Sequence, residues 1–251
     1  MKISIVTIAY NSAQTIEATL QSVIQQDYPD VEYIVIDGGS SDGTQAIVQK
    51  YLHRIAHFSS EPDKGIYDAM NKGVRAATGD VIGVLNSDDF YADASVIRDV
   101  VNTLKAHPEC EALYADLVYV DRAHTDKVTR YWKAGQFNRS RFRQGWMPPH
   151  PTFFVSRSAY DRFGLYSLDL KSAADYELML RFLYKHQIRC CYLPRVITRM
   201  RVGGESNVSL KNRLRANKED RKAWTMNGLR PAWYTLTLKP ISKIGQFIRK
   251  A

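Results

Sequence analysis

Short apolar strands alternate with helical patterns in residues 1–90, and these strands end in polar clusters. Residues 2–9, 31–36 and 81–85 are rich in Ile and Val. The last of these is a continuous apolar run, which is typical of a parallel strand that is buried on both faces. Strands and helices in alternation predict an α/β fold with a Rossmann-like, doubly wound and mainly parallel sheet.

Helical spacing and turn residues place the other elements. Ile16, Leu20 and Val23 recur at the spacing of a helix. A second helix is expected over residues 44–51, with Ser41 or Asp42 as its cap. Residues 91–210 are less regular and predict a smaller, mixed portion. We expect further helices over 66–77, 94–106 and 173–186, and further strands over 57–59, 112–120, 128–132, 188–193 and 196–201.

The composition suits a globular protein with a sizeable core. The chain has 251 residues, of which 45% are hydrophobic and 24% are charged, and both fractions are ordinary for such domains. Cys190 and Cys191 are adjacent and Cys110 stands alone, so we expect no disulfide framework, no zinc site and a reducing, cytosolic location. No stretch has the apolar length of a signal peptide or of a membrane span.

The basic residues gather in residues 211–251. This segment contains eleven Lys and Arg but two acidic residues, so it carries the whole formal net charge of +9. The charge implies an anionic partner, and the Trp and Tyr residues suit a helix that lies on anionic lipid. Pro231 and Pro240 would break that helix. The alternative is a charged helix packed on the body of the protein. No nucleic-acid-binding motif is present, so no nucleic acid partner is expected.

Asn86, Ser87, Asp88 and Asp89 follow the buried strand directly. Adjacent carboxylates repel each other unless a cation compensates their charge, and hard oxygen ligands suit Mg²⁺ or Mn²⁺. A metal held by Asp88 and Asp89 could clamp a diphosphate. The alternative is a turn that caps a helix starting near Phe90, because Asp and Ser are common at helix starts.

A glycine-rich segment, residues 37–44, follows the second strand. Its glycines permit a close approach of the backbone to a ligand, and Asp37 could accept hydrogen bonds from a base or a ribose. An ordinary turn between a strand and a helix is the alternative. The segment does not match the dinucleotide-binding fingerprint, and the chain contains no phosphate-binding loop of the P-loop type.

Thr7, Tyr10 and Asn11 lie at the end of the first strand. Tyr10 could stack on a base, and Thr7 and Asn11 could bond to a nucleotide. Polar residues are routine at strand ends, but here three polar clusters end three strands. A parallel sheet would place all three clusters along one edge, where the ligands of such sheets bind.

Residues 3–89 resemble the nucleotide-binding half of the family 2 glycosyltransferases, which have the GT-A fold. The matching segments agree in order and spacing, and they are residues 5–11, 36–44, 63–73, 77–80 and 86–89. The resemblance implies that Asp88 contacts the ribose or the metal and that Asp89 is the principal metal ligand. It also implies a set of residues that contact the donor nucleotide: Thr7, Tyr10, Asn11, Asp37 and Asp68.

The resemblance further implies a catalytic base at the start of a later helix, and Asp175 fits this position. Many relatives carry a Glu-Asp pair there, whereas this chain has Ala174 before Asp175. Glu177 is the competing candidate, and the alternative role for Asp175 is an acid favoured by the helix dipole. The implied reaction is inverting, because Asp175 takes the proton of an acceptor hydroxyl as that oxygen attacks the anomeric carbon in one displacement.

The resemblance implies three partners: a nucleotide-sugar (a UDP-sugar first), a divalent metal (Mn²⁺ or Mg²⁺), and a glycan or lipid-linked acceptor of bacterial surface or exopolysaccharide biosynthesis. The implied domain covers residues 1–210, with the nucleotide-binding half in 1–90 and the acceptor half in 91–210. Residues 211–251 would bring the protein to the inner face of the cytoplasmic membrane.

Two further segments and two rival functions stay open. His150 could touch the diphosphate or the acceptor, or it could be a buried structural residue. Residues 201–207 could close over the donor or form a solvent loop. The rival functions are a nucleotide-sugar or glycan-binding protein without turnover, and a nucleotidyltransferase.

Overall fold

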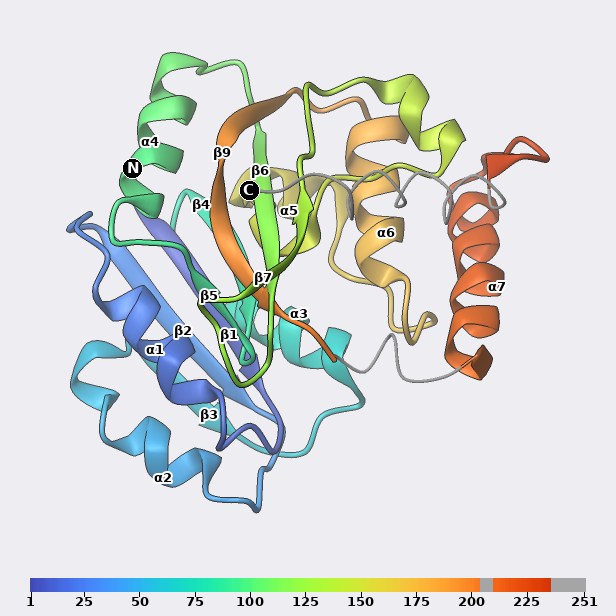
Figure 1. Ribbon diagram of the computed structural model, residues 1–251. Coiled ribbons are helices and arrows are strands. Elements are labelled where there is room, and N and C mark those ends of the chain that lie inside the picture. Colours follow the sequence, from blue (N-terminus) through green and yellow to red (C-terminus); the bar gives the residue numbers. More distant parts are fainter. Residues whose placement is uncertain (204–209, 236–251) are drawn as a thin grey trace.

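The computed structural model describes residues 1–203 and 210–235, with side chains from residue 217 onward in the second range (Figure 1). Within these ranges, nine strands form one sheet in the order β3-β2-β1-β4-β8-β6-β9-β5, and β7 pairs with β6 beside this path. Helices pack on both faces of the sheet. This is the layered α/β arrangement that the alternating pattern predicts.

The first half of the chain forms the parallel part of the sheet. β1 (Ile3–Ala9) lies between β2 (Val31–Asp37) and β4 (Val81–Asn86), and β3 (His57–Ser60) pairs with β2 at the edge. All of these pairs are parallel. Every residue of β1 is buried, as expected of a parallel strand that is covered on both faces. The prediction of a mainly parallel sheet is confirmed for this half.

The second half of the chain adds the mixed part. β8 (Phe154–Ser156) is antiparallel to both β4 and β6 (Ala112–Val120), whereas β9 (Cys190–Arg201) is parallel to β6. β5 (Asp89–Tyr91) and β7 (Val128–Trp132) pair antiparallel with β9 and β6, respectively. Because β5 follows β4 directly, the polar cluster that ends β4 comes next to the last residues of β9.

Two predictions for this part are wrong in detail. The short strands expected over residues 188–193 and 196–201 are the single strand β9, which passes Pro194 at a register shift against β6. A bulge of this kind lets a residue without an N–H stay in the sheet. The residues from Asp89 onward form a strand, so the helix-capping turn considered for Asp88 and Asp89 does not form.

The helices form two layers, one on each face of the sheet. One layer contains α1 (Ile16–Ile24), α2 (Thr44–Gln49) and α4 (Val96–Ala106), and the other contains α3 (Ile66–Ala76), α5 (Arg157–Phe163) and α6 (Ala174–Met179). β1 contributes to both cores, because Ile3 and Ile5 pack with the first layer and Val6 and Ile8 with the second. The alternation follows the period of two in a strand. Shorter helical turns are η1 (Leu52–Arg54), η2 (Arg139–Gln144), η3 (His150–Thr152) and η4 (Leu180–Lys185).

Two helix ends differ from the predictions. The helix expected over residues 173–186 is α6 followed directly by η4, whose turns are of the wider π type. α2 begins after Gly43, which has a φ of 98° in the left-handed region. Asp42, one of the two expected caps, lies one residue earlier and accepts a hydrogen bond from the Thr44 amide at 3.1 Å.

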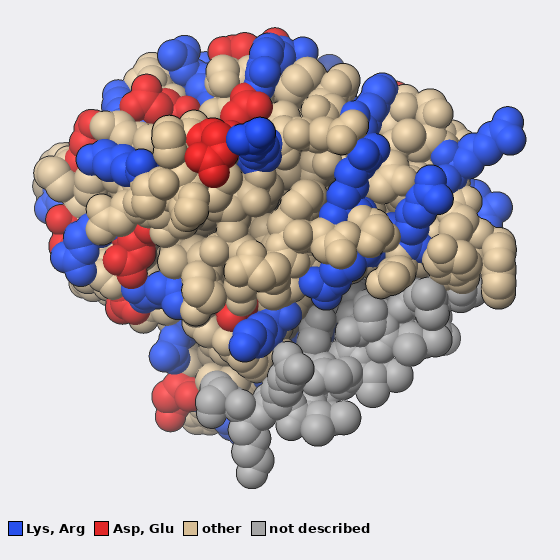
Figure 2. All heavy atoms as spheres, turned by 90° about the horizontal axis from the view of Figure 1, so that it is seen from above, with Lys and Arg blue, Asp and Glu red and all other residues tan. Residues whose placement is uncertain are grey.

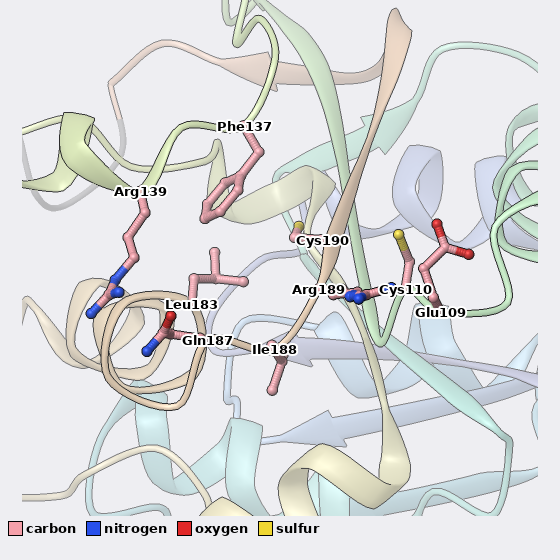
Figure 3. A pocket seen from close by; sticks show the side chains of 9 residues that line it. All are labelled: Glu109, Cys110, Phe137, Arg139, Leu183, Gln187, Ile188, Arg189 and Cys190. Atoms are coloured by element: carbon pink, nitrogen blue, oxygen red, sulfur yellow. The ribbon is translucent and has the colours of Figure 1, made fainter.

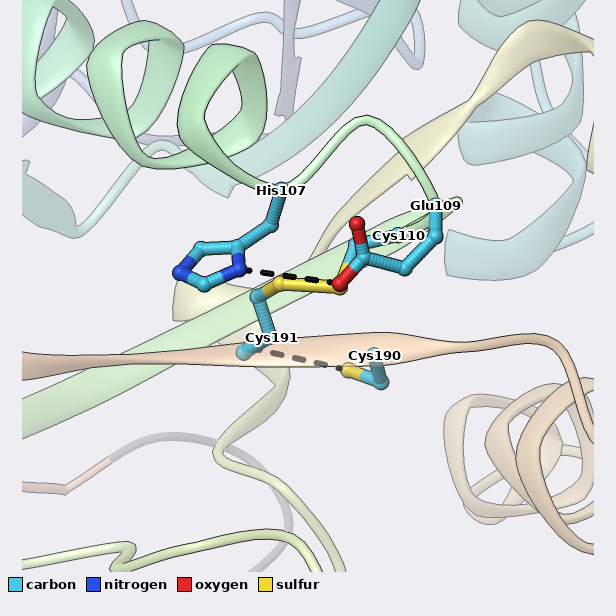
Figure 4. The surroundings of a disulfide bond; sticks show 5 residues. All are labelled: His107, Glu109, Cys110, Cys190 and Cys191. Carbon is cyan, nitrogen blue, oxygen red and sulfur yellow. Dashed lines mark hydrogen bonds and ion pairs between the residues drawn. A yellow bond between two sulfur atoms is a disulfide. The ribbon is translucent and has the colours of Figure 1, made fainter.

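The structure corrects the expectation for the cysteines. Cys110 and Cys191, which are 81 positions apart, form a disulfide with their Cα atoms 6.0 Å from each other (Figure 4). Leu113 of β6 lies opposite Cys191 of β9, so the pairing of these strands brings the two cysteines together. Cys190 is unpaired. With a disulfide present, cysteine usage no longer argues for a reducing location.

The described part of the basic segment packs on the body of the protein, as the alternative expectation has it. α7 (Leu210–Met226) lies beside α6 (Figure 1). Trp224 is fully buried, and its indole N–H donates to the Tyr176 hydroxyl at 2.9 Å. Pro240 and the rest of residues 236–251 lie outside the described residues. Among the helices that the structure describes, none is long and apolar enough to cross a bilayer.

Candidate active site

The three polar clusters meet at one edge of the sheet. In the strand register, Ala9 lies opposite Asp37 on one side of β1, and Ile8 lies opposite Asn86 on the other. Side chains connect the segments that follow these strands. The Ser12 and Ser87 hydroxyls are 2.7 Å apart. The expectation that the clusters lie side by side is therefore confirmed.

Asn11 links the first cluster to the glycine-rich segment. Its main-chain N–H donates to the Ser40 hydroxyl at 2.8 Å, and its side-chain oxygen accepts from the main-chain N–H of Ser41 at 3.0 Å. Its φ of 46° is in the left-handed region, which Asn tolerates better than most residues. The polar groups of Asn11 thus shape the loop beside the site.

Asp37 is a buried and fully bonded carboxylate. It accepts hydrogen bonds from the Ser40 amide at 2.9 Å, from the Ser40 hydroxyl, and from the Ser60 hydroxyl at 2.6 Å. Tyr10 is 67% exposed. A Cβ atom at Gly38 would lie 3.4 Å from the Tyr10 ring and 2.9 Å from an Asp63 oxygen. The backbone at Gly38 is therefore packed closely between Tyr10 and the loop before α3.

Two of the expected donor contacts take supporting positions in the structure. Thr7 is fully buried, and its hydroxyl is 3.0 Å from that of Tyr33. Thr7 thus lies beneath the sheet edge, where its hydroxyl is paired with Tyr33, and its contact with a nucleotide stays a prediction. Asp68 lies in the first turn of α3 and accepts a hydrogen bond from the Lys64 amide at 3.0 Å. Its carboxylate holds the loop that precedes the helix.

Asp89 is a fully buried carboxyl group. Among the described residues, neither of its oxygens makes a hydrogen bond of ordinary geometry, and the Arg201 main chain and the Asn86 side chain are the polar groups next to it. Burial raises the pKa of Asp89 well above its usual range and the charge of Asp88 raises it further, whereas the main chain and the charge of Arg201 and the Asn86 side chain oppose this shift. An orphaned buried polar group is costly and calls for an explanation such as a bound ion.

The residues present fit a divalent cation held jointly with a ligand. Asp88 and Asp89 are adjacent, and the Asn86 side-chain oxygen also lacks a partner among the described residues. Within residues 1–203 and 210–235, no group of three or more His, Cys, Asp or Glu could hold an ion. A cation here would therefore need further oxygen ligands from water or phosphate, which is the usual arrangement for Mg²⁺.

Arg201 places a positive charge beside these aspartates. It is the last residue of β9, and its guanidinium donates to the Asp88 carbonyl at 2.6 Å and lies 4.7 Å from the centre of the Phe90 ring. Burial lowers the pKa of Arg201, and the charges of Asp88 and Asp89 oppose this shift. Arg201 was expected at the start of a loop, and no local pattern in the sequence indicates its contact with Asp88. Residues 204–207 of that loop lie outside the described residues.

Asp175 lies in the first turn of α6, and its side chain is 21% exposed. One carboxylate oxygen accepts from the Tyr67 hydroxyl at 3.2 Å, and the other is 3.5 Å from His150 Nδ1. Glu177, the competing candidate, is buried and paired with Arg181 at 2.9 Å. Asp175 is therefore the better placed of the two for contact with a ligand.

A surface hollow of about 390 Å³ lies elsewhere in the molecule (Figure 3). Cys190 at the start of β9 is among its lining residues, whereas Asp89 lies opposite Met200 near the other end of that strand. Ten strand residues separate these points by roughly 30 Å. The hollow is thus not part of the candidate site.

Comparisons with known proteins agree with this site. The model of the family described as "Glycosyl transferase family 2" matches residues 4–165. An uncharacterized glycosyltransferase of Mycobacterium tuberculosis is 34% identical over 185 residues, which cover 71% of this chain and 68% of the relative. A PGL/p-HBAD biosynthesis glycosyltransferase of Mycobacterium bovis is 28% identical over 199 residues, which cover 78% and 72%.

Solved structures share the fold. Residues 1–349 of TarS of S. aureus in complex with UDP-GlcNAc superpose with a TM-score of 0.70 and 20% identity, over 90% of this chain and 65% of that chain. The chain thus spans slightly less than two thirds of that structure. The mannosyltransferase PcManGT of Pyrobaculum calidifontis, in complex with GDP-Man and Mn²⁺, has a TM-score of 0.68 and 19% identity, over 96% and 69%. These structures confirm the GT-A fold, and the family match shows that this chain belongs to glycosyltransferase family 2.

Proposed function

We propose that this chain is an inverting, metal-dependent glycosyltransferase that moves a sugar from a UDP-sugar to an acceptor hydroxyl. The observation that carries the proposal is the fully buried Asp89 carboxyl, whose oxygens make no hydrogen bond of ordinary geometry among the described residues and which lies at the edge where three polar clusters meet. A site of this kind suits a diphosphate and its counter-ion.

The nucleoside would lie beside Tyr10 and Asn11. The exposed Tyr10 ring offers a stacking surface for the base, and Asp37 and Asn11 hold the glycine-rich loop in place below it. Asp88 would contact the ribose or the metal. Uridine is our first choice of base, in line with the TarS complex, and guanosine, as in the PcManGT complex, is the second.

Asp89 and Asp88 would hold Mn²⁺ or Mg²⁺. When bound, such an ion offsets the negative charge that develops on the departing diphosphate. Arg201 adds a fixed positive charge next to both carboxylates, and a charge that is already in place needs no reorganisation during the reaction. The PcManGT complex contains Mn²⁺, which supports the choice of metal.

Asp175 would be the base. Its carboxylate accepts the proton of the acceptor hydroxyl while that oxygen bonds to the anomeric carbon. The bond from the anomeric carbon to the diphosphate oxygen breaks in the same step, so the anomeric centre inverts. α6 and α3 hold Asp175 in place, and catalysis depends on such orientation.

The acceptor would be a lipid-linked glycan of bacterial surface-polysaccharide synthesis at the inner face of the cytoplasmic membrane. Trp233 is 87% exposed and Met226 39% exposed. Figure 2 views the molecule from above. On the side of α6 and α7, the surface that it shows carries more Lys and Arg than acidic residues. Exposed aromatic and basic residues together favour contact with anionic lipid.

The test is nucleotide release from UDP-GlcNAc or GDP-Man, with and without Mn²⁺. Turnover that requires Mn²⁺ and is abolished in Asp175→Asn is the expected result. Tight binding of a nucleotide-sugar without turnover, under all conditions and with glycan acceptors added, would instead favour a binding protein of the same fold.

A further inference from the structure

The Asp175 carboxylate is contacted at both of its oxygens by side chains from two other elements. Tyr67 of α3 donates to Oδ1 at 3.2 Å, and His150 of η3 lies 3.5 Å from Oδ2 through Nδ1. The three residues are far apart in sequence. Both contacts reach Asp175, a partly exposed acid in the first turn of α6.

We propose that His150 and Tyr67 are positioning residues that fix the orientation of the Asp175 carboxylate for proton abstraction. The inference rests on the proposed function, because it assigns a task to residues around the proposed base. The proton of the acceptor hydroxyl goes to Asp175, and the His150 side chain stabilises the carboxylate before that transfer. A hydrogen bond or a positive charge at an ionised carboxylate favours its charged form.

Tyr67 is held rigidly enough to act as a support. Its ring is buried and stacks on that of Tyr166, with the ring centres 5.9 Å apart. The Asn71 side chain fixes Tyr166 through two main-chain hydrogen bonds, from the Tyr166 amide and to its carbonyl, both 2.9 Å long. The Tyr67 hydroxyl therefore points at Asp175 from a packed position on α3.

His150 also sits on a rigid support. It lies between Pro149 and Pro151, and Pro restricts the backbone. Thr152 in the same turn is fully buried, and its hydroxyl donates to the carbonyls of Pro149 at 2.8 Å and Ala115 at 3.0 Å. These bonds fasten η3 to β6, so His150 approaches Asp175 from a fixed direction.

Among the described residues, the titratable groups that face Asp175 are Tyr67 from α3, His150 from η3, and Tyr166 from the segment between α5 and α6. Burial raises the pKa of Tyr166 well above its usual range, and the neighbouring Asp175 charge adds to this shift, so Tyr166 stays neutral. Of these three side chains, the imidazole of His150 is the one of a type that can carry a positive charge.

The test compares His150→Gln, Tyr67→Phe and Asp175→Asn with wild type. His107→Gln is the matched control, because His107 Nδ1 lies 3.6 Å from Glu109 in an exposed pair. With UDP-GlcNAc or GDP-Man as the donor and nucleotide release as the readout, we expect kcat to fall about tenfold or more in His150→Gln and Tyr67→Phe. KM for the donor should change less than about twofold, because neither side chain is assigned to donor binding, and His107→Gln should match wild type.

A second readout does not depend on activity. NMR titration of the His150 ring, assigned by its loss in His150→Gln, should give a midpoint that falls by about half a pH unit or more in Asp175→Asn, because an opposite charge favours the protonated ring. The other histidine signals should titrate as in wild type. This measurement keeps the proposal testable even where Tyr67→Phe loses activity through misfolding.

The outcomes separate the two claims. Wild-type protein that releases no nucleotide from any donor would contradict the proposed function. Wild-type turnover that is lost in Asp175→Asn but retained in His150→Gln and Tyr67→Phe, with an unchanged His150 midpoint, would overturn the positioning role and leave the proposed function in place.

Discussion

The Arg201 guanidinium donates to the main-chain carbonyl of Asp88 across a 2.6 Å contact. This bond joins the end of β9 to the turn between β4 and β5, although 113 positions separate the two residues. It fixes the turn that carries both aspartates and places a cation beside them. In the proposed reaction, a residue from the second half of the chain would therefore contribute to the donor site.

Replacing Arg201 should weaken nucleotide binding. Arg201→Gln removes a charge-assisted hydrogen bond, so the affinity for UDP or GDP in the presence of Mn²⁺ should fall about tenfold or more. Arg201→Lys keeps the charge but lacks the planar guanidinium, so its affinity for the nucleotide should lie between those of wild type and Arg201→Gln. Calorimetry measures the change. Arg54→Gln is the control, because that guanidinium also donates to a main-chain carbonyl, Ile24 at 3.2 Å. Equal affinities for Arg201→Gln and wild type would contradict the role.

Glu32 should make the stability of the fold sensitive to acid. Burial alone would raise its pKa, but hydrogen bonds from Lys2, Ser4 and Thr78 lower it to about 2. A carboxylate with a lowered pKa stabilises the folded state above its unfolded pKa and loses this effect as pH falls toward 2. The free energy of unfolding should therefore fall by about 2 to 3 kcal/mol between pH 6 and pH 2 on account of this residue.

Chemical denaturation at several pH values measures the effect of Glu32. Glu32→Gln should lose this part of the acid sensitivity and be less stable than wild type at pH 7. Glu17→Gln, a change at an exposed residue, should behave like wild type. Parallel pH profiles for wild type and Glu32→Gln would show that Glu32 is not responsible.

Trp224 should anchor α7 to α6. Its side chain is fully buried and hydrogen-bonded to Tyr176, so Trp224→Ala should lower the free energy of unfolding by about 3 to 5 kcal/mol. Trp233→Ala removes the same kind of side chain from a position that is 87% exposed and should cost less than about 0.5 kcal/mol. Similar losses in both variants would contradict the packing described for α7.

Trp233 should instead contribute to contact with lipid. Flotation with vesicles of phosphatidylcholine and phosphatidylglycerol should recover wild-type protein, and neutral vesicles should recover less, because the basic residues require anionic lipid. We expect Trp233→Ala to bind the anionic vesicles about fivefold more weakly, because an interfacial aromatic is lost. Absence of wild-type protein from the floating fraction would overturn the proposed membrane contact.

Local patterns predicted the parallel half of the fold and its polar edge. Strands β1, β2 and β4 are short apolar runs, and their alternation with helices predicts a parallel register. The gathering of the three polar clusters at one edge could therefore be predicted from local patterns. The burial of Thr7 escaped this reasoning, because its partner Tyr33 lies on another strand and the sequence does not show which face such a residue takes.

Long-range pairings could not be predicted. The Cys110–Cys191 disulfide depends on the parallel pairing of β6 with β9, and no spacing in the sequence encodes it. The contact of Arg201 with Asp88 and that of His150 with Asp175 also join distant segments. The sequence shows that these residues are polar, but their partners depend on the topology of the sheet.

The most direct test of the account is calorimetric titration with UDP, GDP and dTDP, each with and without Mn²⁺, on wild type and Asp89→Asn. Asp93→Asn is the control, because that carboxylate pairs with Arg195 outside the site. The account predicts binding of one nucleotide that requires Mn²⁺ and is lost in Asp89→Asn but kept in Asp93→Asn. Binding that is indifferent to Mn²⁺ and to Asp89→Asn, or no binding of any nucleotide, would contradict a metal-dependent donor site at the buried aspartate.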